Sequence, residues 1–291
     1  MTGRAATLGY LAGWRLVRVA PERVSRAAFD RIADRVYAGN GASVQRLRAN
    51  LARVVPDDEL DDTVHAGVRS YFRYWCESFR LPAWPMDDLV RRTRLVNEHV
   101  IREAAAAGNG IVVPLPHMGN WDWAGAWACR EVQPLMTVAE RLEPERLYDE
   151  FVRYRAGLGM QVIPLTGDVN PMLPLLRWVR KGGLVCLLGD RDLSHSGIEV
   201  QLLGETARVP AGPAVLARRT GAALVPVTLR YDGPEMVLTF HDPVPHRDGD
   251  DGIVAMTQQV MDAFSDAIRA SPQDWHMMQR VFTRDLDEVR A

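Results

Sequence analysis

A histidine and an aspartate that could act together lie in the segment 116–123, which reads PHMGNWDW. It directly follows an apolar run, 111–115, typical of a buried strand. A turn there can bring His117 close to Asp122, so that the carboxylate holds one imidazole nitrogen while the other nitrogen faces a substrate hydroxyl. This is the base–orienter half of a catalytic triad without its serine. It predicts direct acyl transfer, in which His117 activates an alcohol to attack a thioester and Asp122 stabilises the imidazolium.

The HxxxxD spacing alone is not specific, because His246 and Asp251 repeat it. We interpret that second match as a solvated turn, since it lies in the polar run 246–252. Other catalytic signatures are missing from the sequence: it has no GxSxG nucleophile elbow, no GxxxxGK[ST] phosphate loop and no HExxH pair. The three cysteines show no CxxC spacing and are predicted to be buried thiols, and no metal site is predicted.

The elements that must position His117 follow from the apolar pattern. Residues 1–80 have helical spacing, and Asp57, Asp58 and Glu59 supply an acidic first turn for a long helix. After residue 93, short apolar runs alternate with amphipathic stretches. The predicted strands are 111–115, 135–139, 161–165, 184–189, 223–230 and 236–241. The predicted helices between and after them start near Trp121 and span 144–156, 171–180 and 252–270.

Continuous β-rich runs fit strands that are buried on both faces of a sheet. We therefore predict an α/β fold with a central mostly parallel (mixed) β-sheet flanked by helices and a helical N-terminal subdomain. The whole chain, 1–291, is predicted to form a single domain. Residues 1–90 would be its helical, membrane-facing part and residues 91–291 its α/β catalytic core.

The longer string HMGNWDWAGAW resembles the first motif of bacterial lysophospholipid-type acyltransferases. It is most similar to the branch that contains lipid A acyltransferases and actinobacterial phosphatidylinositol mannoside acyltransferases. Four further blocks in the same order resemble that branch: FVRYRAGLG at 151–159, LGDRDLS at 188–194, LGETARVPAGPA at 203–214 and PQDWHM at 272–277. Met118 and Leu203 depart from the usual residues, so the resemblance supports the reaction type more firmly than the substrate.

The resemblance implies further site residues, each with a structural alternative. Asp190 follows the strand 184–188, where the family places an acid that would hold the imidazole or the acceptor hydroxyls; the alternative is a loop cap. Arg155 would contact the phosphate-bearing part of acyl-CoA, or it is a surface arginine at a helix end. Asn120 would contact the substrate and shape the loop. The remaining predicted contacts, each of which could instead be scaffold, are Ser196, Glu205 and Arg208 in a loop region that rims the pocket, and Arg219 at a helix end.

Together these features predict an acyl-CoA-dependent O-acyltransferase without an acyl-enzyme. The resemblance points to a palmitoyl-like donor and a phosphatidylinositol mannoside acceptor, and acyl-CoA is a co-substrate, with no cofactor expected. Three alternatives stay open. They are a lipid A-type lauroyl or myristoyl acyltransferase, a His/Asp-dependent acyl-CoA thioesterase, and a scaffold that kept the fold and lost the activity.

The charge distribution indicates a membrane partner. The net charge of −2 excludes a general nucleic-acid binder, but residues 1–56 carry +7 and the remainder −9. No segment has the roughly 20 mostly apolar residues of a spanning helix. We therefore expect a peripheral, monomeric protein on the cytoplasmic face of the plasma membrane, with Tyr10 and Trp14 on anionic lipid. The alternative is a solvated face in an arginine-rich protein.

Overall fold

The computed structural model describes residues 13–140, 144–165, 170–192 and 197–287. Ser196 and Tyr10, two residues with predicted contacts, lie outside these ranges. In the described part of the chain, no helix is both long and apolar enough to cross a membrane.

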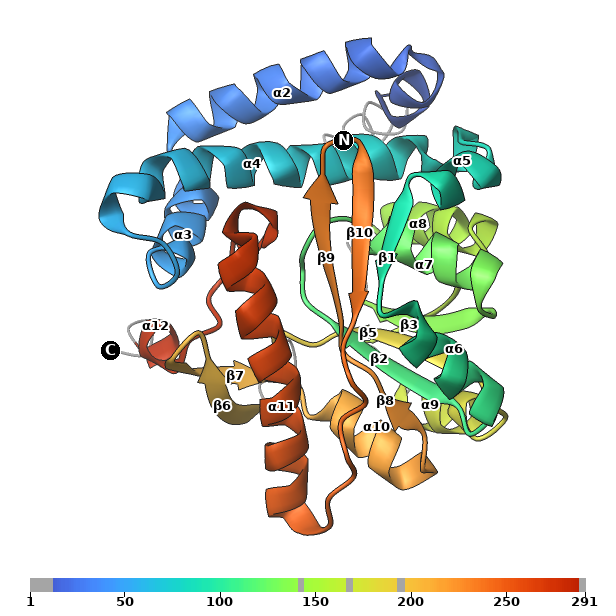
Figure 1. Cartoon of the computed structure of the whole chain (residues 1–291). Coiled ribbons are helices and arrows are strands. Elements are labelled where there is room, and N and C mark those ends of the chain that lie inside the picture. Colours follow the sequence, from blue (N-terminus) through green and yellow to red (C-terminus); the bar gives the residue numbers. More distant parts are fainter. Residues whose placement is uncertain (1–12, 141–143, 166–169, 193–196, 288–291) are drawn as a thin grey trace.

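The N-terminal part is a layer of helices over one end of the molecule (Figure 1). The acidic first turn starts the longest of these helices, as predicted, because carboxylates stabilise a helix N-terminus. The layer contains α2 (Glu22–Gly39), α3 (Ala42–Leu51), α4 (Asp57–Arg80), the short 3₁₀ helix η1 (Leu81–Ala83) and α5 (Met86–Arg91). Trp14 does not face outward as expected. It is 6% exposed, packs against Phe79 and Tyr154, and donates its indole N–H to the Phe79 carbonyl.

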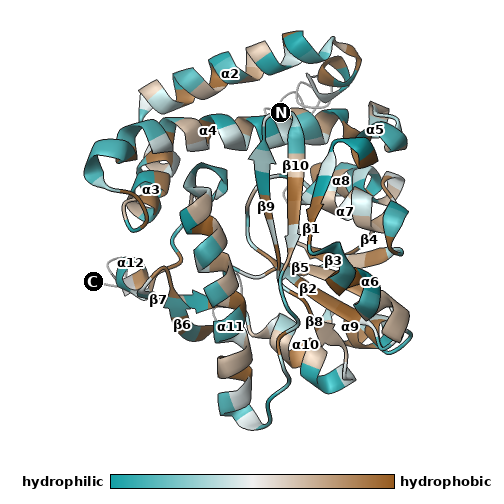
Figure 2. Cartoon of the chain, viewed as in Figure 1, coloured by the Kyte–Doolittle hydropathy of each residue, from teal (hydrophilic) through white to brown (hydrophobic). Residues whose placement is uncertain are grey.

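Five strands form a parallel sheet in the order β4-β3-β5-β2-β8. Their bounds are β2 (Ile111–Leu115), β3 (Leu135–Ala139), β4 (Gln161–Pro164), β5 (Leu184–Leu188) and β8 (Ala223–Leu224). Figure 2 shows the brown, hydrophobic colour along β2. All five β2 residues are buried, as expected of a strand with helices on both faces.

Helices cover both faces of this sheet. On one face, α7 lies over the β2 side chains Val113 and Leu115, and on the other, α10 and α11 pack near Pro114. The helices of the core are α6 (Glu98–Ala107), α7 (Trp121–Glu131), α8 (Glu145–Gly157), α9 (Met172–Val179), α10 (Gly212–Thr220) and α11 (Gly249–Ala270). The fold class is therefore confirmed.

A second sheet, with order β1-β10-β9, is mixed. Its strands are β1 (Thr93–Val96), β9 (Val227–Asp232) and β10 (Glu235–Phe240). The single strand predicted at 223–230 is wrong: it is divided into β8 and β9 around Pro226. Proline has no N–H to donate to a ladder, so the chain can change sheets at this point.

A hairpin that the sequence analysis did not predict joins β6 (Ile198–Leu202) to β7 (Glu205–Val209). Both residues of its turn have positive φ, at 56° for Leu203 and 90° for Gly204. This is the backbone required by a type I′ turn, which leucine rarely adopts. The chain then continues after α11 through the 3₁₀ helix η2 (Pro272–Asp274) to α12 (Thr283–Asp287).

Candidate active site

Strand register brings His117 next to Asp190. In the parallel pair β2–β5, Leu115 is the partner of Leu188, and each candidate residue comes two positions after its strand end. The two side chains therefore emerge at the same edge of the sheet, where α/β enzymes place their sites. His117 Nδ1 lies 2.6 Å from Asp190 Oδ1, and the His117 backbone N–H donates to Asp190 Oδ2 at 2.9 Å.

The Asp190 carboxylate is completely buried, whereas the His117 side chain keeps 23% of its surface exposed. Burial by itself would raise the pKa of Asp190. Attraction to His117 and hydrogen bonds from His117 and Trp275 outweigh it and hold the pKa below its ordinary value. A buried acceptor at Nδ1 places the imidazole proton on that nitrogen and leaves Nε2 as the proton acceptor.

Asp122 does not hold His117, which corrects the pairing expected from the HxxxxD spacing. Its Oδ1 accepts from Arg155 Nε at 2.7 Å, and its Oδ2 accepts from the Tyr74 hydroxyl at 3.1 Å. Asp122 lies in the first turn of α7. In this setting it ties α7 to α8 and to α4, beside the His117 loop.

The Arg155 side chain is correspondingly engaged in a contact within the protein. Its side chain is 16% exposed and it forms the ion pair with Asp122. Burial opposes its charge, but the Asp122 carboxylate raises the pKa of the guanidinium. Arg155 is therefore not the surface residue of the alternative interpretation, and its Nε is already used.

Asn120 shapes the loop, as expected, but it is completely buried, which does not fit the predicted substrate contact. It is the N-cap of α7, and its side-chain oxygen accepts the Trp123 backbone N–H at 3.0 Å. Its amide nitrogen lies 3.4 Å from Glu77 of α4. This buried residue therefore fixes where the loop ends and the helix begins.

A cavity of about 640 Å³ opens beside His117. It is lined by Arg155, Trp121 and Arg191, and on another side by the N-terminus of α10 at Gly212 and Pro213. A smaller apolar cavity of about 80 Å³ lies between α7 and the sheet. Both cavities share the lining residues Trp121, Val138, Arg155 and Leu188.

Three further residues that were predicted to contact the substrate do not line the large cavity. Glu205 and Arg208 lie on a strand of the β6–β7 hairpin rather than in a loop, and they pair with Arg53 and Glu199 respectively. Arg219 is exposed in the last turn of α10, whereas the first turn lines the cavity.

Two residues at the site were not singled out from the sequence. Arg191 lines the large cavity and makes no hydrogen bond or ion pair with another residue of the described ranges. Burial lowers the pKa of its guanidinium. Trp275, 85 positions from Asp190, donates to that carboxylate at 2.9 Å. The block PQDWHM at 272–277 marks the segment of Trp275 but not its contact with Asp190, whereas Arg191 follows Asp190 directly.

Comparison with known proteins identifies the family. The model of the bacterial lipid A biosynthesis acyltransferases matches residues 1–284. A phosphatidylinositol mannoside acyltransferase of Mycolicibacterium smegmatis is 43% identical over 99% of this chain and 95% of its own length. Proteins of the same name from two Mycobacterium tuberculosis strains are 42% identical over 100% of this chain and 92% of theirs. The resemblance expected from the sequence blocks is thus confirmed. The chain belongs to the bacterial lipid A biosynthesis acyltransferase family and is an acyltransferase.

Proposed function

We propose that this acyltransferase moves a palmitoyl-like chain from acyl-CoA to a mannose hydroxyl of phosphatidylinositol mannoside. The observation that carries the chemistry is the His117 imidazole, which borders the large cavity and is held at Nδ1 by the buried Asp190 carboxylate. The acceptor class is supported by the name shared by relatives that are 42–43% identical over nearly the whole chain.

The reaction needs no acyl-enzyme, because the thioester of the donor is already activated. His117 Nε2 takes the proton of the acceptor hydroxyl as its oxygen attacks the thioester carbonyl. The C–S bond then breaks, and the proton passes from the imidazolium to the departing thiolate, so ester and free CoA are formed. Asp190 stabilises the imidazolium during the attack, as the third member of a triad does.

The small apolar cavity supports a long-chain donor. It is lined by residues such as Val113, Leu135 and Phe240, and it adjoins the large cavity through Trp121 and Leu188. An acyl chain that enters it is removed from water, which is favourable by about 0.8 kcal/mol per buried methylene. Exclusion of water there also protects the thioester from hydrolysis.

Arg191 is the residue that we assign to the phosphates of the donor. It is a half-buried cation on the cavity wall without a hydrogen-bonded carboxylate among the described residues, and a phosphate satisfies a guanidinium in two-point geometry. Arg155, the contact expected from the sequence, would instead act by holding Asp122. The Arg191→Gln variant is expected to raise the KM for acyl-CoA about tenfold or more with little change in kcat, whereas an unchanged KM would contradict the assignment.

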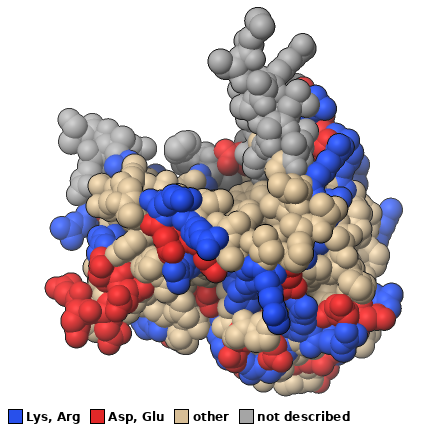
Figure 3. Space-filling view, turned by 90° about the horizontal axis from the view of Figure 1, so that it is seen from above, with Lys and Arg blue, Asp and Glu red and all other residues tan. Residues whose placement is uncertain are grey.

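A membrane-facing surface is supported by α2. Its outward residues include the apolar Val24, Ile32 and Val36, which are 60%, 41% and 38% exposed. Arg23, Arg31 and Arg35 are exposed beside them, and the acidic residues of this helix are partly exposed. Figure 3 looks onto the end of the molecule that α2 covers and shows tan surface between blue and red groups. An apolar stripe flanked by arginines suits the surface of an anionic bilayer, here the cytoplasmic face of the plasma membrane.

The decisive experiment measures CoA release by the purified protein, with and without the mannosylated lipid, for wild type and His117→Ala. Acceptor-dependent CoA release that disappears in the variant is the expected result. Release at the wild-type rate by His117→Ala would refute the base assignment. Equal release without acceptor would identify a thioesterase, a preference for a glucosaminyl lipid would identify a lipid A-type enzyme, and no turnover with any donor would identify an inactive scaffold.

A further inference from the structure

The segment 272–277 runs against the His117 loop and bonds to it at several points. The His276 backbone N–H donates to the His117 carbonyl at 2.7 Å, and the Gly119 backbone N–H donates to the Asp274 carbonyl at 3.0 Å. Met118 and Trp275 form an antiparallel bridge between these two contacts. The loop that carries His117 is thus paired, like a short strand, with a segment more than 150 residues further along the chain.

Trp275 extends this pairing to the carboxylate. The residue is completely buried, and its indole Nε1–H donates to Asp190 Oδ2 at 2.9 Å. The same oxygen accepts the His117 backbone N–H, while Oδ1 faces His117 Nδ1. Two donors therefore fix one carboxylate oxygen, and the other oxygen is left for the imidazole.

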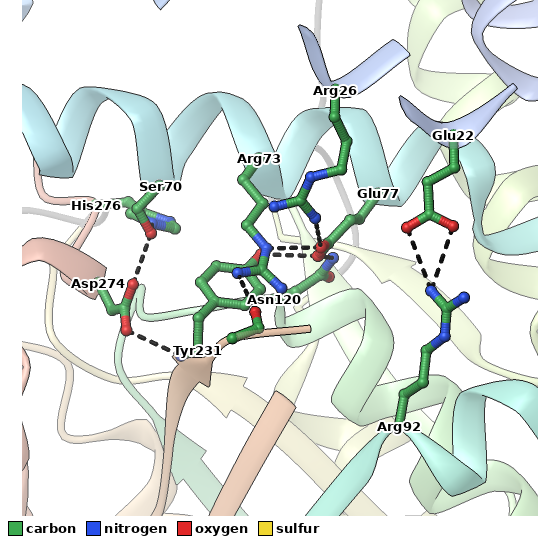
Figure 4. Close-up of polar contacts among 11 residues, drawn as sticks. Glu22, Arg26, Ser70, Arg73, Glu77, Arg92, Asn120, Tyr231, Asp274 and His276 are labelled. Atoms are coloured by element: carbon green, nitrogen blue, oxygen red, sulfur yellow. Dashed lines mark hydrogen bonds and ion pairs between the residues drawn. The ribbon is translucent and has the colours of Figure 1, made fainter. Parts of the chain in front are cut away.

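The backbone next to Trp275 is anchored from two other elements (Figure 4). Asp274 accepts from the Ser70 hydroxyl of α4 at 2.7 Å and from the Tyr231 backbone N–H of β9 at 2.9 Å. Asp274 is 2% exposed, so these contacts are shielded from water. A rigid frame made by α4 and the second sheet therefore holds the indole.

We propose that Trp275 is a positioning residue for acyl transfer, whose indole N–H sets the orientation and the proton affinity of the His117–Asp190 pair. The proposal rests on the proposed function of the His117–Asp190 pair and adds Trp275 to that pair as a third member. An N–H bond to the carboxylate stabilises the charge most when His117 is neutral, because the imidazolium otherwise compensates that charge. Loss of the indole N–H therefore makes the pair bind its proton more tightly.

Other ionisable groups near the pair do not replace this donor. Arg191 acts on Asp190 through its charge, and no hydrogen bond joins them. Asp122 and Arg155 are paired with each other. Burial lowers the pKa of His276 to about 3, so this neighbour of His117 stays neutral at working pH. Trp275 is the one side chain other than His117 in the described ranges that donates to Asp190.

The test is the pH profile of kcat/KM for Trp275→Phe, with Trp123→Phe as matched control. Trp123 is also completely buried, and its indole donates to Thr93 at 2.8 Å, away from the pair. The expected result for Trp275→Phe is a kcat lower by about tenfold or more with an unchanged KM for acyl-CoA. Its acidic limb should also move to higher pH by roughly half a unit or more. The control should lose stability and keep the wild-type profile.

Two further measurements separate positioning from folding. Benzothienylalanine at position 275 keeps the shape of the ring and replaces the N–H with sulfur, so it should reproduce the shift even if Trp275→Phe fails to fold. In the Asp190→Asn variant, adding Trp275→Phe should lower kcat little further, because both changes act through the same carboxylate. The inference would be overturned if Trp275→Phe had the same pH profile as the Trp123→Phe control. It would also be overturned if the kcat losses of Asp190→Asn and Trp275→Phe multiplied in the double variant. Full activity of His117→Ala would instead refute the base assignment on which this inference rests.

Discussion

At the scale of single residues, the two carboxylates near His117, those of Asp190 and Asp122, have different roles. Asp190 faces the imidazole from the neighbouring strand end, and Asp122 neutralises the buried Arg155. The HxxxxD spacing therefore marks the two ends of a loop, and its aspartate, Asp122, bonds to Arg155 and Tyr74 beside the site rather than to His117. Only the first of these carboxylates is placed to stabilise an imidazolium.

Replacing each carboxylate by its amide should distinguish the catalytic role of Asp190 from the structural role of Asp122. Asp190→Asn is expected to lower kcat by roughly 10³-fold or more, because the imidazole loses the acceptor that sets its tautomer. Asp122→Asn leaves Arg155 buried and unpaired, which costs about 3–5 kcal/mol and lowers the melting temperature by roughly 5 °C or more. Turnover assays and thermal unfolding of both variants check this. A thousandfold loss in Asp122→Asn with an unchanged melting temperature would show that Asp122 is the working partner.

At the scale of elements, α7 forms one wall of the apolar cavity. Gly125 lets this helix approach the sheet, since a Cβ there would lie 2.7 Å from Met160 Cε and 2.8 Å from its sulfur. Both residues line the cavity. The distance between α7 and the sheet therefore sets the room for an acyl chain.

Gly125→Ala should shift the donor preference toward shorter chains. The added methyl group pushes the end of Met160 into the cavity, so turnover of the longest accepted acyl-CoA should fall about tenfold or more. Gly157→Ala is the control, because a Cβ at that helix position meets nothing within 4 Å. Rates with acyl-CoAs of increasing length give the measurement, and an unchanged chain-length profile would show that the chain binds elsewhere.

The helix α2 is the element that tests membrane docking. Two of its three acidic residues form ion pairs with neighbouring elements, Glu22 with Arg92 and Asp34 with Arg69 (Figure 4 shows the first). The double change Ile32→Asp and Val36→Asp should weaken binding to phosphatidylinositol-containing vesicles strongly, since it removes apolar contact and adds repulsion.

Sedimentation with such vesicles measures the loss, and Val254→Asp on α11 provides a control at an equally exposed valine. Because all three side chains are at the surface, the fold should be unchanged. Vesicle binding equal to wild type in the double variant would remove α2 from the membrane interface.

At the scale of the whole molecule, the helical layer and the α/β core build the site together. From α4, Tyr74 bonds Asp122, Ser70 bonds Asp274, and Glu77 lies by Asn120. The N-terminal helices therefore do more than cover the core. They hold three of the segments that surround His117.

Acid stability is a property of this assembled interior. Burial lowers the pKa of His276 from 6.5 to about 3, and it lowers the pKa of His241 as well. Below pH 6.5 the unfolded chain binds a proton that the folded chain does not take up, so the free energy of unfolding must fall as the pH drops toward 3. The slope contributed by one such histidine approaches about 1.4 kcal/mol per pH unit.

His276→Gln removes this titration and should flatten the decline. Urea unfolding of wild type and variant at pH 7.5 and pH 5 gives the comparison, and the difference between the two pH values should be smaller in the variant. The same decline in both proteins would place the acid sensitivity in other groups.

The central strands β2 and β5 could be predicted because each is a short apolar run that is largely buried. The β6–β7 hairpin was missed although Ile198, Val200 and Leu202 alternate with polar residues. Its turn begins with Leu203, which is not a typical turn residue, and so the usual hairpin signal is weak. The division at Pro226 was missed for another reason, since apolar residues continue on both sides of it.

The sequence by itself determined the α/β class, the loop that carries His117, the helix that follows it and the family of the chain. These depend on local patterns and on residue blocks that are contiguous in the chain. Tertiary structure decided which acid meets the imidazole. Asp190 and His117 are 73 positions apart and meet through the register of β2 and β5. Trp275 joins them because the chain returns to the loop after α11. A hydrogen bond depends on distance and direction in space, and spacing along a chain specifies these only within one turn of backbone.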